Sequence, residues 1–147
     1  MRLYRLLGAA ALTAVALGMV AMPSGAKEGD IRFRCKAKGP NHIAIHAKYE
    51  ERARTKGLRE KFSAEFEARP GGSFNSGQQV AIAVDTVPVG VVILTLAPSG
   101  ELSGELEFDS KPSAAHTPFP PNFPDVSAGS MVEAKVAGNT VLGCELQ

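Results

Sequence analysis

Apolar and polar residues alternate with a period of two along much of this chain, beginning at Ile31. In residues 31–38 the odd positions are apolar, and the even positions are the cations Arg32, Arg34, Lys36 and Lys38. This period is that of a β-strand with one face on the core and one in solvent. We therefore expect Phe33 and Cys35 to be buried and the four cations to share one exposed face.

The alternation continues through residues 43–49 after a turn at 39–41, and it becomes ambiguous over residues 50–69. Leu58, Phe62 and Phe66 are spaced as on an amphipathic helix. The alternation of residues 61–68 and the break at 55–57 also fit two strands. We favour two strands joined by a hairpin, because aromatic and small residues suit a pleated surface better than one long helix.

Further strands are predicted within residues 80–84, 91–96, 102–109, 132–136 and 142–146. Pro88-Val89-Gly90 is interpreted as a turn, and the β-branched run 91–96 as a strand covered on both faces. In the strand 102–109, alternate positions are expected to face solvent. These positions, together with the residue before the strand, are Glu101, Ser103, Glu105, Glu107 and Asp109.

Residues 110–125 contain five prolines, which exclude a central strand or a helix and predict an extended loop. About seven or eight short, mostly antiparallel strands separated by turn signals indicate an all-β fold. A single β-sandwich or a small barrel accounts for this pattern.

The amino-terminal segment has a different pattern, with two arginines, an apolar run from Leu6 to Met22, and small residues at Ser24 and Ala26. This order is typical of a secretory signal peptide over residues 1–26. A retained membrane anchor is the alternative, but 17 apolar residues followed at once by Pro23 are short for a bilayer span. We expect a cleaved, secreted or periplasmic bacterial protein with no stable membrane span, leaving residues 27–147 as one β-domain.

Cys35 and Cys144 are the only cysteines, and both fall on apolar faces of predicted strands. In an oxidising compartment, one pair in a small exported domain is most simply a disulfide. The spacing excludes a Cys-x-x-Cys redox motif. We therefore predict a bond between the first and last strands.

Charge is divided along the predicted domain. Residues 27–69 hold 12 Lys and Arg against 7 Asp and Glu, whereas residues 70–147 hold 2 against 8. The near-neutral total gives no support for nucleic-acid binding. Either basic and acidic strands lie side by side, or the surface is bipolar and its basic face, with Arg32, Arg34, Lys36 and Lys38, binds an anionic polymer or an envelope protein.

Four segments carry a resemblance to known proteins: residues 48–52 (KYEER), 61–65 (KFSAE), 89–90 (VG) and 104–109 (GELEFD). Together they resemble small exported bacterial all-β domains of unassigned function. The resemblance spans about two-thirds of residues 27–147. It implies an exported β-domain and carries no catalytic residue.

Two patterns suggest further chemistry. His42 and His46, with His116 from the proline-rich loop, could bind copper or zinc if the fold brought them together, although strand spacing separates the first two by about 13 Å. Glu105, Glu107 and Asp109 could serve glycoside hydrolysis, but the chain has no Trp for a sugar platform. An exposed strand histidine and a solvated acidic face are the simpler interpretations.

Phe119 and Phe123 lie within the most distinctive segment, residues 117–126, which includes the proline-rich run from Pro118 to Pro124. A stiff, proline-rich segment loses little entropy on docking, so the two rings could anchor a partner. We favour the alternative in which both rings cap the open end of the β-core, because exposed rings would promote association.

The sequence contains no catalytic motif such as Gly-x-Ser-x-Gly and no phosphate-binding loop. We therefore expect a non-enzymatic exported domain without a cofactor, with a structural or binding role in the cell envelope. A small periplasmic metal-binding protein is the alternative, and a carbohydrate-active enzyme is the third.

Overall fold

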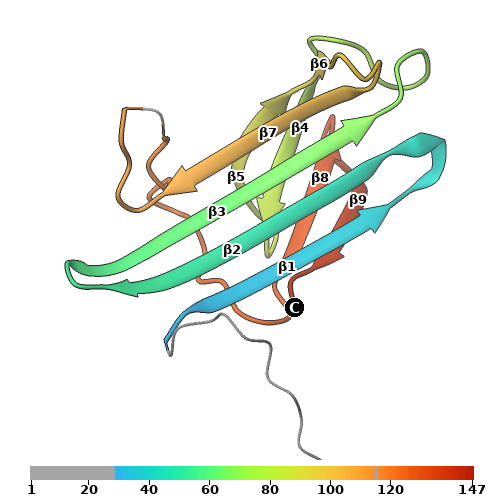
Figure 1. Cartoon of the computed structure of the whole chain (residues 1–147). Helices are drawn as coiled ribbons and strands as arrows, with labels where there is room; N and C mark the ends of the chain where they lie inside the picture. The colour runs from blue at the N-terminus through green and yellow to red at the C-terminus, as the bar shows by residue number, and fades with distance from the viewer. Residues whose placement is uncertain (1–28, 115) are drawn as a thin grey trace, which may run out of the picture.

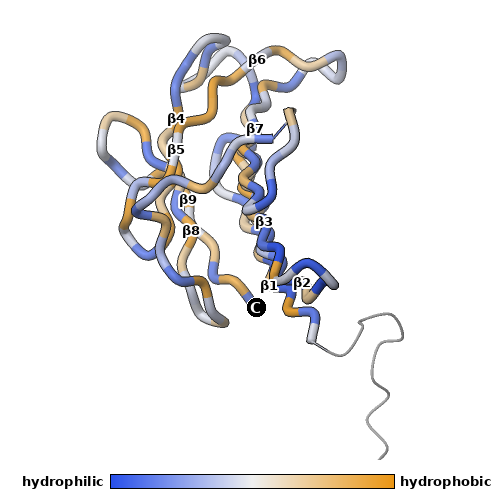
Figure 2. Tube along the Cα trace, turned by 90° about the vertical axis from the view of Figure 1, so that its left-hand side faces the viewer, coloured by the Kyte–Doolittle hydropathy of each residue, from blue (hydrophilic) through white to orange (hydrophobic). Residues whose placement is uncertain are grey.

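The computed structural model describes residues 29–114 and 116–147, so the predicted signal peptide at 1–26 lies outside the described residues. Two antiparallel sheets face each other as two layers (Figures 1 and 2). The prediction of an all-β fold is confirmed, and of the two predicted architectures the sandwich is observed, because the sheets do not close into a barrel. Within the described ranges, no helix has the length and apolarity needed to cross a membrane.

The five-stranded sheet is built mainly from the longest strands, in the order β1-β2-β3-β7-β6. Its members are β1 (Ile31–Lys38), β2 (Ala44–Arg54), β3 (Gly57–Ala68), β7 (Leu102–Asp109) and β6 (Thr95–Leu96). A short 3-10 turn, η1 (Pro40–His42), joins β1 to β2. The hairpin between β2 and β3 turns at residues 55–56, which confirms two strands rather than a helix in this region.

The four-stranded sheet has the order β5-β4-β8-β9. Its members are β4 (Gln79–Val84), β5 (Val87–Ile93), β8 (Met131–Val136) and β9 (Asn139–Glu145). Within residues 110–114 and 116–125, the part of this segment that the structure describes, no strand forms, as the prolines predict. One hydrophobic core fills the space between the sheets, with Phe62, Phe66 and Ile45 on one side and Ile82 and Val132 on the other.

Two predictions about residues 88–96 are wrong. Residues 88–90 belong to β5, and the chain turns instead at Asp85 and Thr86, whose φ angles are both positive. Pro88 is tolerated because β5 is an edge strand. The run 91–96 is also not covered on both faces: Val91, Ile93 and Leu96 are 51%, 56% and 61% exposed, so only alternate residues reach the core.

Two glycines let the sheets approach closely at this edge. A Cβ added to Gly104 of β7 would lie 2.8 Å from the carbonyl oxygen of Ile93, and one added to Gly90 of β5 would lie 3.1 Å from Leu106. Since real Cβ atoms do not approach backbone oxygens so closely, larger residues would push the sheets apart. The chain then passes from β5 in one sheet to β6 in the other.

The opposite edge is held by the predicted disulfide. Cys35 of β1 is bonded to Cys144 of β9, with 5.6 Å between the Cα atoms. Beside it, the Arg34 amide donates to the Gln147 carbonyl at 2.9 Å, and the Gln147 amide donates to the Arg34 carbonyl at 3.1 Å. Phe33 and Cys35 are half-buried rather than fully buried, because this edge strand is covered only by the far end of the chain.

Candidate ligand-binding surface

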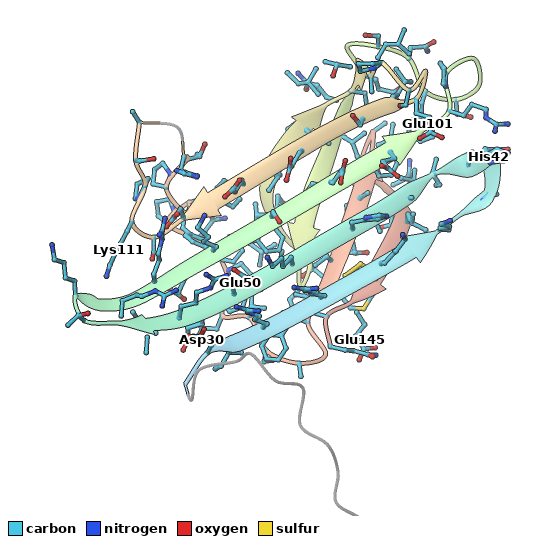
Figure 3. The ribbon with its side chains drawn as sticks, viewed as in Figure 1. Asp30, His42, Glu50, Glu101, Lys111 and Glu145 are labelled. Carbon is cyan, nitrogen blue, oxygen red and sulfur yellow. A yellow bond between two sulfur atoms is a disulfide. The ribbon has the colours of Figure 1, made fainter. Side chains whose placement is uncertain are left out.

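Strand alternation places the outward side chains of β1, β2, β3 and β7 in rows across the outer face of the five-stranded sheet (Figure 3). One row, here called the paired row, is Arg32, Glu50, Lys61 and Asp109. The next two, here called the segregated rows, are Arg34, Lys48, Ser63 and Glu107, then Lys36, His46, Glu65 and Glu105. The prediction that the four β1 cations share an exposed face is confirmed.

The paired row alternates positive and negative charge, and its acids are buried by their partners. Glu50 is only 4% exposed, and its carboxylate lies 2.6 Å from the Lys48 ammonium and 2.6 Å from the Arg52 guanidinium. Burial alone would raise the pKa of Glu50, but the hydrogen bonds and charges of Lys48 and Arg52 outweigh it and lower that pKa. Glu50 therefore pairs with several surrounding cations and has a structural role.

Asp109 is the second acid of the paired row, and it is fully buried. Arg59 donates to both carboxylate oxygens, at 3.0 and 2.5 Å, and the Lys111 amide donates at 2.9 Å. The bidentate bond from Arg59 is the main cause of a pKa well below the usual range. The prediction that Asp109 faces solvent is wrong, because Arg59 and the start of the loop cover it.

This burial removes one member of the acidic trio considered for glycoside hydrolysis. Asp109 is held as an ion, and both its oxygens are occupied by Arg59. Glu105 and Glu107 are exposed on the same strand. Of the three acids that the sequence suggested for glycoside hydrolysis, only Glu105 and Glu107 therefore remain accessible.

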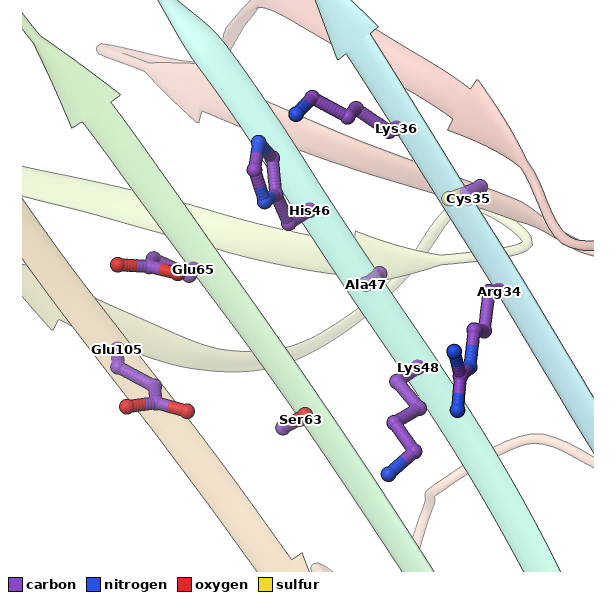
Figure 4. Close-up of a pocket in the computed structure, with 9 residues that line it drawn as sticks. All are labelled: Arg34, Cys35, Lys36, His46, Ala47, Lys48, Ser63, Glu65 and Glu105. Carbon is purple, nitrogen blue, oxygen red and sulfur yellow. The ribbon is translucent and has the colours of Figure 1, made fainter.

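The segregated rows surround a hollow of about 570 Å³ on the outer face (Figure 4). Arg34, Lys36, His46 and Lys48 from β1 and β2 line one side, and Glu65 and Glu105 from β3 and β7 line the other. Ser63 lies between them, and its short side chain leaves space that a Lys or Glu would fill. The hollow thus contains both signs of charge on opposite sides.

The charges of the hollow are mostly unpaired. Among the residues that the structure describes, Arg34, Lys36, Glu65 and Glu105 form no ion pair. Burial, and then the carboxylates of Glu65 and Glu107, raise the pKa of Glu105. A cation bound beside Glu105 would therefore stabilise the charged form of its carboxylate.

The three histidines lie in separate places. His42 is exposed in the turn η1, and His46 lines the hollow. His116 contacts the Ser113 hydroxyl at 2.7 Å and Glu107 at 3.7 Å. Over residues 29–114 and 116–147, no three His, Cys, Asp or Glu side chains are grouped to hold a metal ion. The alternative of a metal site built from His42, His46 and His116 finds no support in this geometry.

Phe119 and Phe123 fold back against the core and are half-buried. Their ring centroids are 4.7 Å apart, and Phe123 lies 5.2 Å from Phe62 and 5.9 Å from Phe108. The four rings form one cluster at the end of the sandwich. Both rings contact the core, as the capping hypothesis requires, but they bury less of their surface than full capping would.

The sequence did not indicate that Lys48, Ser63 and Glu65 form part of a shared surface. Their outward orientation follows from the alternation of apolar and polar residues, but their neighbours depend on which strands pair.

Comparison with protein-family models, with curated proteins and with solved structures finds no match for this chain.

Proposed function

We propose that this protein is an exported, non-enzymatic β-domain that binds a charged component of the bacterial cell envelope through the hollow of the segregated rows. The observation that carries the proposal is the pair Arg34 and Lys36, exposed cations without an ion-pair partner among the described residues. They stand beside Lys48 at the edge of a depression, so an anionic group can contact several cations at once.

Two further observations support export. The leader at residues 1–26 has the composition of a signal peptide. The disulfide between Cys35 and Cys144 is of the kind that persists in oxidising compartments.

The proposal is tested with immobilised polyphosphate as a defined anionic probe, measured by biolayer interferometry on the purified, disulfide-bonded protein. Reversing both charges, in Arg34→Glu with Lys36→Glu, should weaken binding at least tenfold, which corresponds to about 1.4 kcal/mol. Binding of the unmodified protein should also fall as salt is added, because exposed charges are screened.

A matched control changes the net charge equally at sites away from the hollow. Arg54 and Arg69 are both exposed. Arg54 is the last residue of β2, at the hairpin turn, and Arg69 follows the end of β3. The double variant Arg54→Glu with Arg69→Glu should retain binding within about threefold. Equal losses in the two variants, or no binding by the unmodified protein, would refute a specific site at the hollow.

A further inference from the structure

The two sides of the hollow contain like charges placed directly opposite each other. Arg34 pairs in register with Lys48 across β1 and β2, and Glu65 pairs with Glu105 across β3 and β7. Like charges at opposite positions of neighbouring strands destabilise a sheet. The adjacent paired row avoids this by alternating its signs. The hollow therefore keeps a cationic pair and an anionic pair apart, at a cost in stability.

The two pairs face one space. Figure 4 shows Arg34 and Lys48 on one side of Ser63, and Glu65 and Glu105 on the other. Neighbouring strands lie about 4.8 Å apart, so the long side chains of β2 and β3 can reach groups only a few bonds apart in one ligand. A simple anion would be attracted at one side and repelled at the other, whereas a zwitterion would satisfy both.

Resting on the proposed function, we infer that the ligand of the hollow carries an ammonium group close to a phosphate, as in phosphoethanolamine. The Arg34 guanidinium, with its planar fork of donors, and the Lys36 ammonium contact the phosphate. Lys48 adds positive charge beside them while its ammonium stays paired with Glu50. Glu65 and Glu105 accept hydrogen bonds from the ammonium group, which has three donors and no acceptor. Ser63 leaves room for the carbons between them.

The experiment compares three small probes on the disulfide-bonded protein by isothermal titration calorimetry: phosphoethanolamine, inorganic phosphate and ethanolamine. We expect phosphoethanolamine to bind at least tenfold more tightly than either of the others. The variant Glu65→Gln with Glu105→Gln should lose that advantage, and its affinity for inorganic phosphate should stay the same or increase.

The control variant is Glu67→Gln with Glu101→Gln, which removes two carboxylates outside the hollow. It should keep the preference for phosphoethanolamine. Vesicles with and without phosphatidylethanolamine distinguish a lipid head group from a free or sugar-linked source, and binding of either the compound or the vesicles supports the chemistry.

The inference is overturned if phosphoethanolamine binds no better than phosphate and vesicles with phosphatidylethanolamine bind no better than vesicles without it. It is also overturned if the two Glu variants behave alike. These outcomes are separate from those of the polyphosphate test. Loss of polyphosphate binding in the Arg34 and Lys36 variant would still support the proposed anion site even if the Glu65 and Glu105 variant had no effect.

Discussion

The paired row and the segregated rows lie side by side on one sheet and use the same residue types in opposite ways. In the paired row, each acid is buried against cations, and Asp109 is fully inaccessible. In the segregated rows, the charges are exposed or half-buried and grouped by sign around Ser63. Pairing of opposite charges across strands thus stabilises one part of the sheet face, whereas grouping by sign leaves the charges of the other part exposed and unpaired.

The largest expected effect comes from the disulfide, which attaches the cationic strand β1 to β9. Replacing Cys35 and Cys144 by Ala should lower the free energy of unfolding by about 4–5 kcal/mol, because the bond closes a loop with a sequence separation of 109. Urea unfolding measures this loss. Hydrogen exchange should rise at β1 and β9 before β3 and β7, and a uniform rise would contradict a local role at the cationic edge.

The next largest effect tests the paired row. Asp109→Asn should lower the free energy of unfolding by about 3 kcal/mol, because it breaks a buried ion pair. Glu107→Gln, on the exposed side of the same strand, should change it by less than about 0.5 kcal/mol. Thermal melts of both variants provide the comparison. Equal losses would show that the two rows do not differ in the way that we describe.

Phe123→Ala tests how much the aromatic packing beneath the paired row contributes to stability. Phe62 and Phe108, which contact Phe123, are next to Lys61 and Asp109 in sequence. Because the Phe123 ring is only half-buried, its loss should cost about 2 kcal/mol, below the range for a fully buried Phe. An unchanged melting temperature, together with loss of a binding partner, would favour the recognition hypothesis for this loop.

The smallest effect is that the contributions of Asp109 and Glu105 to stability depend on pH with opposite signs. The folded pKa of Asp109 is lowered, so its contribution to stability is present above about pH 3.9 and is lost as the pH falls through the folded value. The folded pKa of Glu105 is raised, so stability decreases as the pH rises from about 4.3 through the folded value. Glu105→Gln should therefore stabilise the protein at pH 7 by roughly 0.2–1 kcal/mol.

Stability curves of Asp109→Asn and Glu105→Gln against pH should thus diverge from the unmodified protein in opposite directions. The Asp109 variant should lie well below it at pH 7 and converge with it in acid. The Glu105 variant should lie slightly above it at pH 7 and also converge in acid. Curves displaced in the same direction at pH 7 would contradict the assignment of the two carboxylates to different environments.

The alternation of residues 31–38 and the inward positions of Cys35 and Cys144 were sufficient to predict the first strand and the disulfide. These features depend on local periodicity, which a single sequence contains. The burial of Asp109 depends on Arg59, which is 50 residues away in sequence. The hollow depends on the pairing of β3 with β7, which places Glu65 opposite Glu105.

The misinterpretation of residues 88–96 has a different physical cause. A β-branched run can be buried on both faces or can lie at an edge with one face open, and the two cases have the same composition. Val91 and Ile93 alternate with the buried Val92 and Leu94, so they point away from the facing sheet and into solvent. Proline is typical of turns, but an edge strand can also accommodate it, as β5 accommodates Pro88.

The bond between β1 and β9 also has a consequence for the order of folding. The β1–β2–β3 meander is made of local hairpins and can form early during synthesis, whereas contacts between the first and last strands close the longest loop. Until β9 arrives, Arg34 lacks its backbone partner at Gln147, and Cys35 lacks Cys144. The cationic strand therefore becomes rigid only in the final step, and a chain interrupted before β9 would retain a nascent sheet whose cationic edge is not yet fixed.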